Sequence, residues 1–433
     1  MNIAAISTPP GMGGIAVIRV SGPQSVQLVG RHFSPFNPKH QLDNRTTHTV
    51  TFGRFLDAAG EVLDEVVCTL FRAPHSFTGE DVVEISCHGS VYIQQQILQT
   101  LLAGSDIRLA EPGEFTRRAF ANGRMDLTQA EAVADLIASQ NAAQHRIALS
   151  QMKGSVSRQL DRLRDQLLEL TSLLELELDF SEEDVLFADR SQLLSIAHSI
   201  DDEVCRLSGS FAAGNAIKNG IPVAIIGAPN VGKSTLLNAL LKDDRAIVSD
   251  IQGTTRDLIE DTITLGGFLF RFIDTAGIRF TDDQIELLGI ERSRNAAQRA
   301  QIILLMTEPG VAFPELETRP DQTVIRIENK TPKFQALHGI GLPELEEQLI
   351  CIARQTQGAD GNILITNLRH KKALDQAHHD IQTVIRGLDT HLSGDLVAED
   401  LHAVIDSLNT ILGRSITSQE TLNNIFSHFC VGK

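Results

Sequence analysis

The chain has 433 residues, a formal net charge of −17, 42% hydrophobic residues and 21% charged residues. This length predicts two to four domains, and the composition excludes a disordered chain. The acidic charge argues against a protein that coats nucleic acid through bulk electrostatics. It does not exclude an enzyme that touches RNA through a small site or through a basic partner.

Several classes of membrane and secreted protein are also disfavoured. No apolar run approaches the roughly 20 residues that span a bilayer. The N-terminal sequence MNIAAISTPPGMGG has neither the basic region nor the long apolar stretch of a secretory signal. The five scattered cysteines include no Cys-x-x-Cys pair, which favours reduced thiols and a cytoplasmic location.

Residues 1–118 predict an α+β domain, because the runs GIAVIRVSG, EVVCTLFRA and DVVEISCHG alternate with Gly/Pro turns. Residues 119–214 are predicted to be helical. Asp126 and Gln129 stand at the spacing of a capping box at a helix start. Leucines three and four residues apart predict one apolar seam on a long helix: Leu160, Leu163, Leu167, Leu170 and Leu174. The acidic stretch DFSEEDVLF then predicts a solvated linker.

In residues 215–356 strands and helices alternate as in a parallel α/β sheet: PVAIIG, KSTLLNALL, FRFIDTAG, AQIILLM, TVIRI and LPELEEQLI. Residues 357–433 are again helical and end in FCVGK. A helical region on both sides of an α/β unit suggests that this unit is inserted into one helical bundle.

The run GAPNVGKS, Gly227 to Ser234, fits the phosphate-loop pattern G-x-x-x-x-G-K-S. It follows an apolar strand and opens a helix, which is the context that the motif requires. Its glycines allow backbone amides to wrap phosphates, and Lys233 supplies charge to the outer phosphates. Ser234 is placed for Mg²⁺. The sequence therefore predicts a nucleotide site.

Two further runs indicate a GTPase-type domain. DIQGTTRD supplies Thr254 and Thr255, and a threonine there can complete a magnesium shell when a γ-phosphate is present. FRFIDTAG ends a strand with Asp274-x-x-Gly277, where the carboxylate can hold Mg²⁺ through water and the Gly277 amide can contact the γ-phosphate.

The residue after Gly277 is Ile278, whose aliphatic side chain cannot orient a water molecule. Hydrolysis therefore needs another polar group. The residues alone leave four candidates open: Asp282, Asp283, Gln284 and Glu286.

With these motifs in view, the whole chain resembles the tRNA uridine-modification GTPase family MnmE, also called TrmE. The resemblance rests on TPPGMGGIAVIRVSG, FTGEDVVEISCHG, EPGEFTRRAFANGRMDLTQAEAVADLI, GAPNVGKSTLLNALL, DIQGTTRD, DTAGIR and FCVGK. It implies a folate-binding and dimerisation domain at 1–118 and a helical domain in two parts, 119–214 and 357–433. It also implies a Ras-like P-loop G domain inserted at 215–356.

The resemblance implies a function as well. Members are potassium-activated GTPases that form homodimers and work with the flavoprotein MnmG. They add a carboxymethylaminomethyl or aminomethyl group to the wobble uridine of certain tRNAs. The implied cofactors are Mg²⁺, K⁺, GTP or GDP, and 5-formyl-tetrahydrofolate as the one-carbon source. A basic RNA-facing surface on the partner would reconcile this acidic chain with a tRNA substrate.

The family pattern also assigns roles to individual residues. Glu286 matches the carboxylate that positions the attacking water, and Ser234 and Thr255 match the magnesium ligands. The implied potassium ligands are Asn230, Ser249, Thr254 and backbone groups near Ile251. The implied folate contacts are Arg19, Glu84, Arg124 and Lys433, and Cys430 matches a C-terminal thiol used in the modification by unspecified chemistry. The implied nucleotide contacts are Asn230, Val231, Gly232, Lys233, Ser234, Thr235, Ser249, Asp250, Ile251, Gln252, Gly253, Thr254, Thr255, Asp274, Thr275, Ala276, Gly277, Asn329 and Lys330.

The chain departs from the family at the guanine-reading loop. The family has Asn-Lys-x-Asp followed later by Ser-Ala-Lys/Arg, whereas this chain has Asn329-Lys330-Thr331-Pro332 followed almost at once by Gln335-Ala336-Leu337. A lost charged bidentate contact typically costs about 1.5–3 kcal/mol. We therefore predict weaker and less base-selective nucleotide binding, unless backbone amides or an acid such as Glu328 replace the missing reader.

Two other functions fit parts of the sequence. A nucleotide- and folate-binding scaffold of the same complex would hydrolyse GTP poorly because its base pocket is degraded. A folate-dependent methyltransferase with an unrelated GTPase appendage is disfavoured, because it leaves the switch motifs unexplained.

Overall fold

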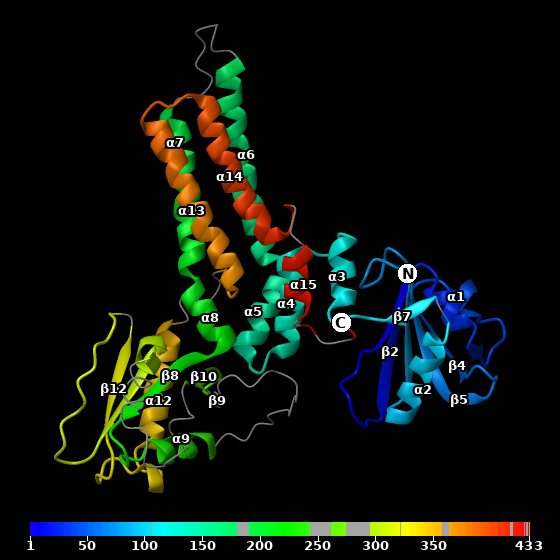
Figure 1. Cartoon of the computed structure of the whole chain (residues 1–433), viewed down its shortest axis with the longest axis horizontal. Helices are drawn as coiled ribbons and strands as arrows, with labels where there is room; N and C mark the ends of the chain where they lie inside the picture. Colours follow the sequence, from blue (N-terminus) through cyan, green and yellow to red (C-terminus); the bar gives the residue numbers. More distant parts are fainter. Residues whose placement is uncertain are drawn as a thin grey trace. The chain divides into compact units, whose positions relative to one another are not determined.

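The computed structural model contains two compact units, and each is described by itself (Figure 1). The first unit comprises Met1–Ala134, Gln151–Ser157 and Asn409–Lys433, and the second comprises Asp135–Ser150 and Arg158–Leu408. The structure describes residues 1–104, 106–179, 190–242, 261–273, 295–320, 322–356, 363–415, 419–427, 429 and 432.

The first unit contains a seven-stranded sheet with the strand order β3-β4-β5-β6-β2-β1-β7. Its strands are β1 (Asn2–Ile6), β2 (Ile15–Ser21), β3 (Phe33–Pro35), β4 (Thr49–Leu56), β5 (Val62–Phe71), β6 (Val82–His88) and β7 (Ile107–Leu109). Neighbouring strands are antiparallel except for the parallel pair β1 and β7. The three β-branched runs expected to form strands are β2, β5 and β6, so this expectation is confirmed.

Alternation of buried and accessible residues along β4 and β5 places one face of this sheet on a core. Helices α1 (Ser25–Gly30) and α2 (Val91–Leu102) supply the other side of that core. Ile18, Phe55 and Ile85 are completely buried within the first unit.

Three further helices contribute to the first unit: α3 (Glu114–Ala121), the start of α4 (Leu127–Ala138) and α15 (Gln419–Ser427). The Asp126 side chain accepts from the Gln129 N–H at 3.0 Å, and the Gln129 side chain accepts from the Asp126 N–H at 3.0 Å. The predicted capping box is therefore confirmed. Leu127, from α4, packs with Phe426 and Phe429 from the C-terminal segment.

The second unit contains a five-stranded sheet with the order β12-β11-β8-β10-β9. Its strands are β8 (Ile221–Gly227), β9 (Asp261–Leu265), β10 (Phe268–Phe272), β11 (Ile302–Thr307) and β12 (Thr323–Glu328). All neighbouring pairs are parallel except the hairpin β9–β10. Every residue of β11 is buried, as expected for a parallel strand covered on both faces.

Helices α9 (Lys233–Lys242) and α12 (Leu342–Thr356) pack on one face of this sheet. The other face contacts the helical residues 295–299, whose Ala296 and Ala297 pack near Ala224 and Ile303. The predicted alternation of strands and helices in this region is confirmed.

Helices α6 (Ser155–Asp179), α7 (Arg190–Gly209), α13 (Leu368–Asp389) and α14 (Gly394–Leu412) form a bundle (Figure 1). Helices α5 (Ala142–Met152) and α8 (Phe211–Asn219) also contribute to the second unit. The five leucines of the predicted seam on α6 are at most 1% exposed, which confirms the seam. The interrupting stretch DFSEEDVLF lies outside the described residues beyond Asp179.

Helices α7 and α13 precede and follow the five-stranded sheet in sequence, yet they pack side by side (Figure 1). The Arg190 guanidinium donates to the Leu388 carbonyl at 3.1 Å, and the Ser208 hydroxyl donates to Asp375 at 2.5 Å. The start of α7 thus contacts the end of α13, and the end of α7 contacts the start of α13, so the two helices are antiparallel. The chain leaves this helical layer, forms the sheet and returns.

Among the described residues, every helix is too short or too polar to cross a lipid bilayer.

Candidate nucleotide-binding site

The predicted phosphate loop connects β8 to α9, as the motif requires. Asn230 and Gly232 adopt the left-handed conformation, with φ of 63° and 96°. A Cβ atom on Gly232 would stand 2.4 Å from the Asn329 amide nitrogen, so the position needs glycine for its conformation and for the space. The loop ends at Lys233, where α9 begins. The free N–H groups at the N-terminus of α9 therefore point toward the loop.

Lys233 lies over this loop. Its ammonium group donates to the carbonyl oxygens of Gly227 and Ala228, each at 2.8 Å. Burial lowers the pKa of Lys233. The next residues, Ser234 and Thr235, lie half-buried in the first turn of α9. The structure therefore brings the described part of the predicted phosphate site together.

Asn329 joins this loop to the far end of the sheet. Its side chain donates to the Val231 carbonyl at 2.8 Å and accepts from the Ala336 N–H at 3.1 Å. Its own backbone N–H donates to the Thr307 carbonyl at 2.9 Å, and the residue is only 4% exposed. One buried residue thus connects the phosphate loop and the Gln335-Ala336-Leu337 segment through its side chain, and β11 through its backbone N–H.

Lys330 extends from the same strand end in the left-handed conformation, with φ of 64°. Its ammonium group donates to the Asn230 carbonyl at 3.3 Å and to the Glu308 carboxylate at 2.5 Å. Glu308 carries no motif signal and was not predicted, because its partner follows it only after 22 residues and a separate strand.

Pro332 occupies a tight turn. The Thr331 N–H donates to the Phe334 carbonyl at 3.1 Å, and the Phe334 N–H donates to the Thr331 carbonyl at 3.3 Å and to its hydroxyl at 3.0 Å. Proline suits the second position of such a turn because its φ is already fixed. This four-residue turn carries the chain directly from β12 to the short helix η2 (Ala336–His338), where the family pattern has a longer segment.

Fourteen of the predicted site residues lie outside the residues that the structure describes: Ser249, Asp250, Ile251, Gln252, Gly253, Thr254, Thr255, Asp274, Thr275, Ala276, Gly277, Glu286, Cys430 and Lys433. The alternatives Asp282, Asp283 and Gln284 lie outside them too.

In the first unit, two of the predicted folate contacts meet. Arg19 on β2 and Glu84 on β6 stand opposite each other and form an ion pair of 2.7 Å. The Arg19 guanidinium also lies 5.5 Å from the ring centres of Phe77 and Phe115. Both side chains are largely shielded from solvent, at 19% and 26% exposure, which strengthens their pairing relative to a surface pair.

The C-terminal segment reaches this location. The Gly432 carbonyl accepts from the Ser7 hydroxyl at 3.1 Å and, more weakly, from Arg19 at 3.5 Å. Gly432 has φ of 97°, and a Cβ atom there would stand 2.4 Å from the Ile6 carbonyl oxygen. Glycine is therefore required for this segment to lie against β1.

Arg124 lies on the loop before α4 and is exposed. The aliphatic part of its side chain runs beside Gly79, since a Cβ atom on Gly79 would stand 3.2 Å from the Arg124 Cγ atom. The structure thus places Arg124 against the loop that precedes β6, the strand that carries Glu84.

The sequence did not reveal Glu114, beside Phe115. This carboxylate is 2% exposed and pairs with Arg108 at 2.5 Å and with Arg118 at 3.0 Å. Burial alone would raise its pKa, but hydrogen bonds from Arg108, the Glu111 N–H and Arg118 outweigh burial and lower the pKa to about 2. Glu114 is therefore a buried anion that orders the segment beside Arg19.

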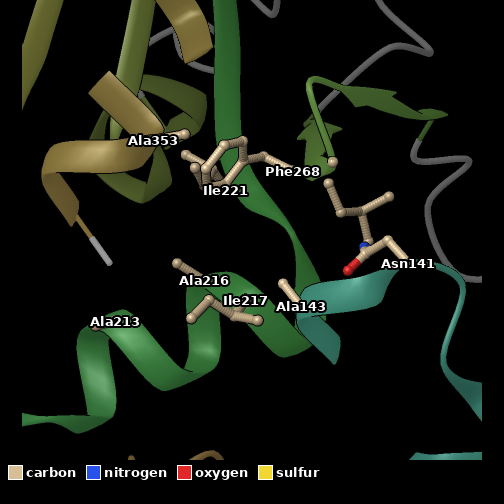
Figure 2. Close-up of a pocket in the computed structure, with 10 residues that line it drawn as sticks. Asn141, Ala143, Ala213, Ala216, Ile217, Ile221, Phe268 and Ala353 are labelled. Carbon is tan, nitrogen blue, oxygen red and sulfur yellow. The ribbon is translucent and has the colours of Figure 1, made fainter. Parts of the chain in front are cut away.

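A small cavity in the second unit carries no ligand chemistry (Figure 2). It has a volume of about 10 Å³ and lies among α8, the start of β8, the β9–β10 turn and α12. Figure 2 shows that Asn141 is the polar side chain among the labelled lining residues, the others being aliphatic or aromatic. A space that holds about one water molecule at most excludes a nucleotide or a folate there.

A parallel sheet whose strand β8 leads into a phosphate loop, with an Asn-Lys pair from another strand end holding that loop, defines a P-loop nucleotide-binding protein. Comparison with known proteins gives the family. Residues 2–124 match the model described as GTP-binding protein TrmE N-terminus, and residues 127–430 match the MnmE helical domain. The chain belongs to the MnmE family of tRNA modification GTPases.

Relatives with the name tRNA modification GTPase MnmE are similar over their full length. The protein of Parabacteroides distasonis is 51% identical over 461 aligned positions, covering 100% of both chains. Those of Bacteroides fragilis and Porphyromonas gingivalis are 48% and 46% identical, covering 100% of this chain and 99% and 98% of the relatives. Because 461 aligned positions exceed the 433 residues of this chain, the first alignment places gaps within it.

Proposed function

We propose that this chain is a potassium-activated GTPase that works with the flavoprotein MnmG on the wobble uridine of certain tRNAs. The pair would add a carboxymethylaminomethyl or aminomethyl group, using a one-carbon unit from formyl-tetrahydrofolate. The observation that carries the nucleotide part is the Asn329 amide bound to both Val231 and Ala336. The family membership carries the link to tRNA modification.

The proposed organisation follows the sequence expectation. Residues 1–118 form the folate-binding and dimerisation domain of a cytoplasmic homodimer. The helical domain consists of residues 119–214 and 357–433, and the Ras-like G domain of residues 215–356.

The phosphate loop suits a nucleotide, because Gly232 keeps it free of a side chain where Asn329 approaches, and α9 opens directly behind it. Lys233 would exchange its two carbonyl contacts for phosphate oxygens and bring its charge to them. Val231, Gly232 and Thr235 would contribute to phosphate binding from the same turn, while Asn329 and Lys330 would flank the base. Thr275 and Ala276, between Asp274 and Gly277, complete this set with Asp250, Gln252 and Gly253.

Two cations support catalysis in this proposal. Ser234 and Thr255 would hold Mg²⁺, and Asn230, Ser249, Thr254 and the backbone at Ile251 would hold K⁺. A cation beside the phosphates supplies positive charge where negative charge develops during hydrolysis. Glu286 would position the attacking water, because it matches the carboxylate that has this role in the family pattern, and the side chain of Ile278 offers no polar group.

The folate proposal rests on Arg19 and Glu84. A guanidinium close to two aromatic rings and paired with a carboxylate offers the donor, acceptor and stacking groups that a pterin ring requires. Arg124 and Lys433 would add positive charge for the folate carboxylates, and Cys430 would serve the modification.

Turnover of purified protein tests the enzyme assignment. We expect K⁺ to stimulate GTP hydrolysis well above the rate in Na⁺, and we expect Glu286→Ala to abolish the stimulated rate. A rate that is equal in the two salts and insensitive to Glu286→Ala would support the alternative, a nucleotide- and folate-binding scaffold of the same complex. Pro332 favours one feature of that alternative, poor selectivity for guanine, because it supplies no carboxylate to the base. Mass analysis of wobble uridines in cells lacking the gene tests the tRNA role.

A further inference from the structure

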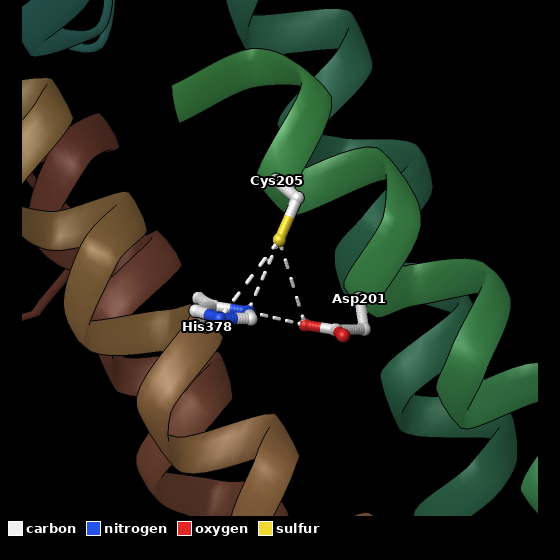
Figure 3. Close-up of side chains that lie close together, drawn as sticks. All are labelled: Asp201, Cys205 and His378. Atoms are coloured by element: carbon white, nitrogen blue, oxygen red, sulfur yellow. Dashed lines mark hydrogen bonds and ion pairs between the residues drawn. The ribbon is translucent and has the colours of Figure 1, made fainter. Parts of the chain in front are cut away.

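A cluster of three side chains with metal-binding atoms lies between α7 and α13, within the helical part of the second unit (Figure 3). Asp201 and Cys205 are one helical turn apart on α7 and share a face. His378 faces them from α13, and Figure 3 shows the three side chains pointing toward a common point. Neither the nucleotide site nor the proposed folate site uses any of them.

The contacts within this cluster cannot all be ordinary hydrogen bonds. The His378 Nδ1 atom lies 2.5 Å from an Asp201 carboxylate oxygen and 3.1 Å from the Cys205 Sγ atom. If Nδ1 carries a proton, it donates to Asp201 and has no lone pair for the thiol. If Nδ1 is unprotonated, it accepts from the thiol but faces the carboxylate lone pair to lone pair.

The same geometry argues against a Cys-His-Asp catalytic triad. A triad needs the nucleophile and the carboxylate on opposite nitrogens of the imidazole. Here both approach Nδ1, and Nε2 is 4.0 Å from the Cys205 sulfur. Three lone-pair donors that converge on one point suit a cation instead.

We propose that Asp201, Cys205 and His378 bind a divalent transition metal ion of the Zn²⁺ type. Thiolate, imidazole and carboxylate are its usual protein ligands, and bond lengths of about 2.0–2.3 Å place tetrahedral ligand atoms roughly 3.4–3.6 Å apart. The three ligand atoms lie within 4.8 Å of one another, so side-chain adjustments of less than about 1 Å reach that geometry. One thiolate and one carboxylate neutralise the two positive charges.

The surroundings support a metal of this kind over Mg²⁺ or Ca²⁺, because those ions take oxygen ligands and not sulfur. Cys205 loses its proton when the ion binds.

A second layer already orients one ligand. The Gln382 side-chain amide, one turn beyond His378, donates to the other Asp201 oxygen at 2.5 Å. This bond leaves the first oxygen directed at the cluster, as outer partners of metal ligands do. Asp201 itself is only 8% exposed, whereas Cys205 is exposed and the His378 side chain is 41% exposed. A fourth position is therefore open to water or to a small solvent-borne ligand.

The site would link the helix that precedes the five-stranded sheet in sequence to the helix that follows it. Apolar residues such as Val204 on α7 and Leu374 on α13 are completely buried and fix the backbones beside the cluster. Metal binding would therefore need side-chain movement alone, and it would stabilise the contact between these two helices.

Zn²⁺ titration of the full-length, chelator-treated and reduced protein tests the proposal, in competition with a chromophoric chelator. We expect one tight equivalent in the wild type that is lost in Cys205→Ser and His378→Ala. Gln382→Ala removes a hydrogen-bond partner of a ligand and should lower the Zn²⁺ affinity about 10-fold. Removal of a ligand itself, in Cys205→Ser or His378→Ala, should lower the affinity by at least this factor. Co²⁺ loading should give a thiolate-to-metal charge-transfer band.

Matched controls are available on the same elements or with the same exposure. Cys351→Ser replaces another exposed cysteine, and His379→Ala replaces the exposed histidine next to His378. Both should bind Zn²⁺ like the wild type. Melting temperatures without metal establish that Cys205→Ser and His378→Ala are folded. Wild-type affinity in either of these two variants, or a charge-transfer band that persists in Cys205→Ser, would overturn the proposal.

Discussion

The two ends of the nucleotide site are built by different means. At the phosphate end, the loop geometry comes from backbone conformation at Asn230 and Gly232 and from the start of α9. At the base end, the family pattern has a carboxylate at the position that Pro332 occupies here, within a tight turn. Asn329 is the side chain that belongs to both ends.

This difference explains why the two ends tolerate sequence change unequally. A phosphate site made of backbone N–H groups keeps its geometry after most side-chain substitutions, provided that glycine remains where a Cβ atom would collide. A base contact made by a single side chain disappears with that side chain. The segment after Lys330 can therefore shorten without disturbing the sheet, because β12 lies at its edge among the described strands.

The largest expected effect comes from Lys233→Ala at the phosphate end. Loss of one preorganised charged donor near reacting phosphates should lower kcat for GTP about 100-fold or more. Steady-state hydrolysis measures this, with nucleotide affinity measured in parallel. Lys372→Ala, which replaces an exposed lysine on α13, is the control and should leave the rate unchanged. Near-normal turnover in Lys233→Ala would show that the lysine of the phosphate loop does not contribute to GTP hydrolysis.

Asn329→Ala tests whether the two ends depend on one side chain. The substitution leaves the buried Val231 carbonyl and Ala336 N–H without their partner, at about 1–3 kcal/mol for each unsatisfied group. We expect nucleotide affinity to fall roughly 30-fold, a loss of about 2 kcal/mol, for GTP and ATP alike. Labelled-GDP competition measures it, and Asn219→Ala, an exposed asparagine on α8, is the control. A loss confined to GTP would mean that Asn329 serves the base end alone.

Much of this architecture was predictable from local sequence patterns. The seam from Leu160 to Leu174 and the capping box at Asp126 are periodic or short-range signals, and each formed as expected. The phosphate loop was predictable for the same reason, because its residues are contiguous and its strand and helix adjoin it.

The contacts that join distant segments were not predictable. The Glu308–Lys330 pair, the buried Glu114 with its arginines, and His378 beside Cys205 each depend on how strands or helices pack. Within one helix or strand, the spacing of two residues in the sequence fixes their distance. Residues on different elements have no such fixed distance, and their charge and type do not supply one. Only the family resemblance connected Arg19 with Glu84 before the sheet register placed them opposite each other.

Pro332→Asp sharpens the comparison by restoring a carboxylate at the base end. We expect the preference for GTP over ATP to rise roughly tenfold, which is the lower bound of about 1.5 kcal/mol for a charged hydrogen bond. Competition of GTP, ATP and XTP against labelled GDP measures the preference. Pro332→Asn keeps the shape of aspartate without its charge and separates the carboxylate from the loss of proline. An unchanged preference in Pro332→Asp would show that the turn from Thr331 to Phe334 keeps this position away from the base.

The smallest expected effect is that of Glu308→Gln. The Lys330 ammonium and Glu308 carboxylate are 55% and 36% exposed, and exposed ion pairs contribute about 0–1 kcal/mol. Because Lys330 keeps its contact with the Asn230 carbonyl, we expect nucleotide affinity to change less than about twofold and base preference to stay as it is.

Glu308→Gln still discriminates between two accounts of the base end. If the Glu308 carboxylate reads guanine in place of the missing aspartate, its two oxygens accept two guanine N–H groups. The glutamine side chain of the variant has one acceptor oxygen, so the preference for GTP must fall. Glu328→Gln is the matched variant, since Glu328 is an exposed acid at the end of β12, two residues before Lys330. A fall in either variant would identify a substitute reader. If the preference falls in neither variant, neither Glu308 nor Glu328 is the substitute reader, and the backbone amides around Ala336 remain the candidates among the described groups.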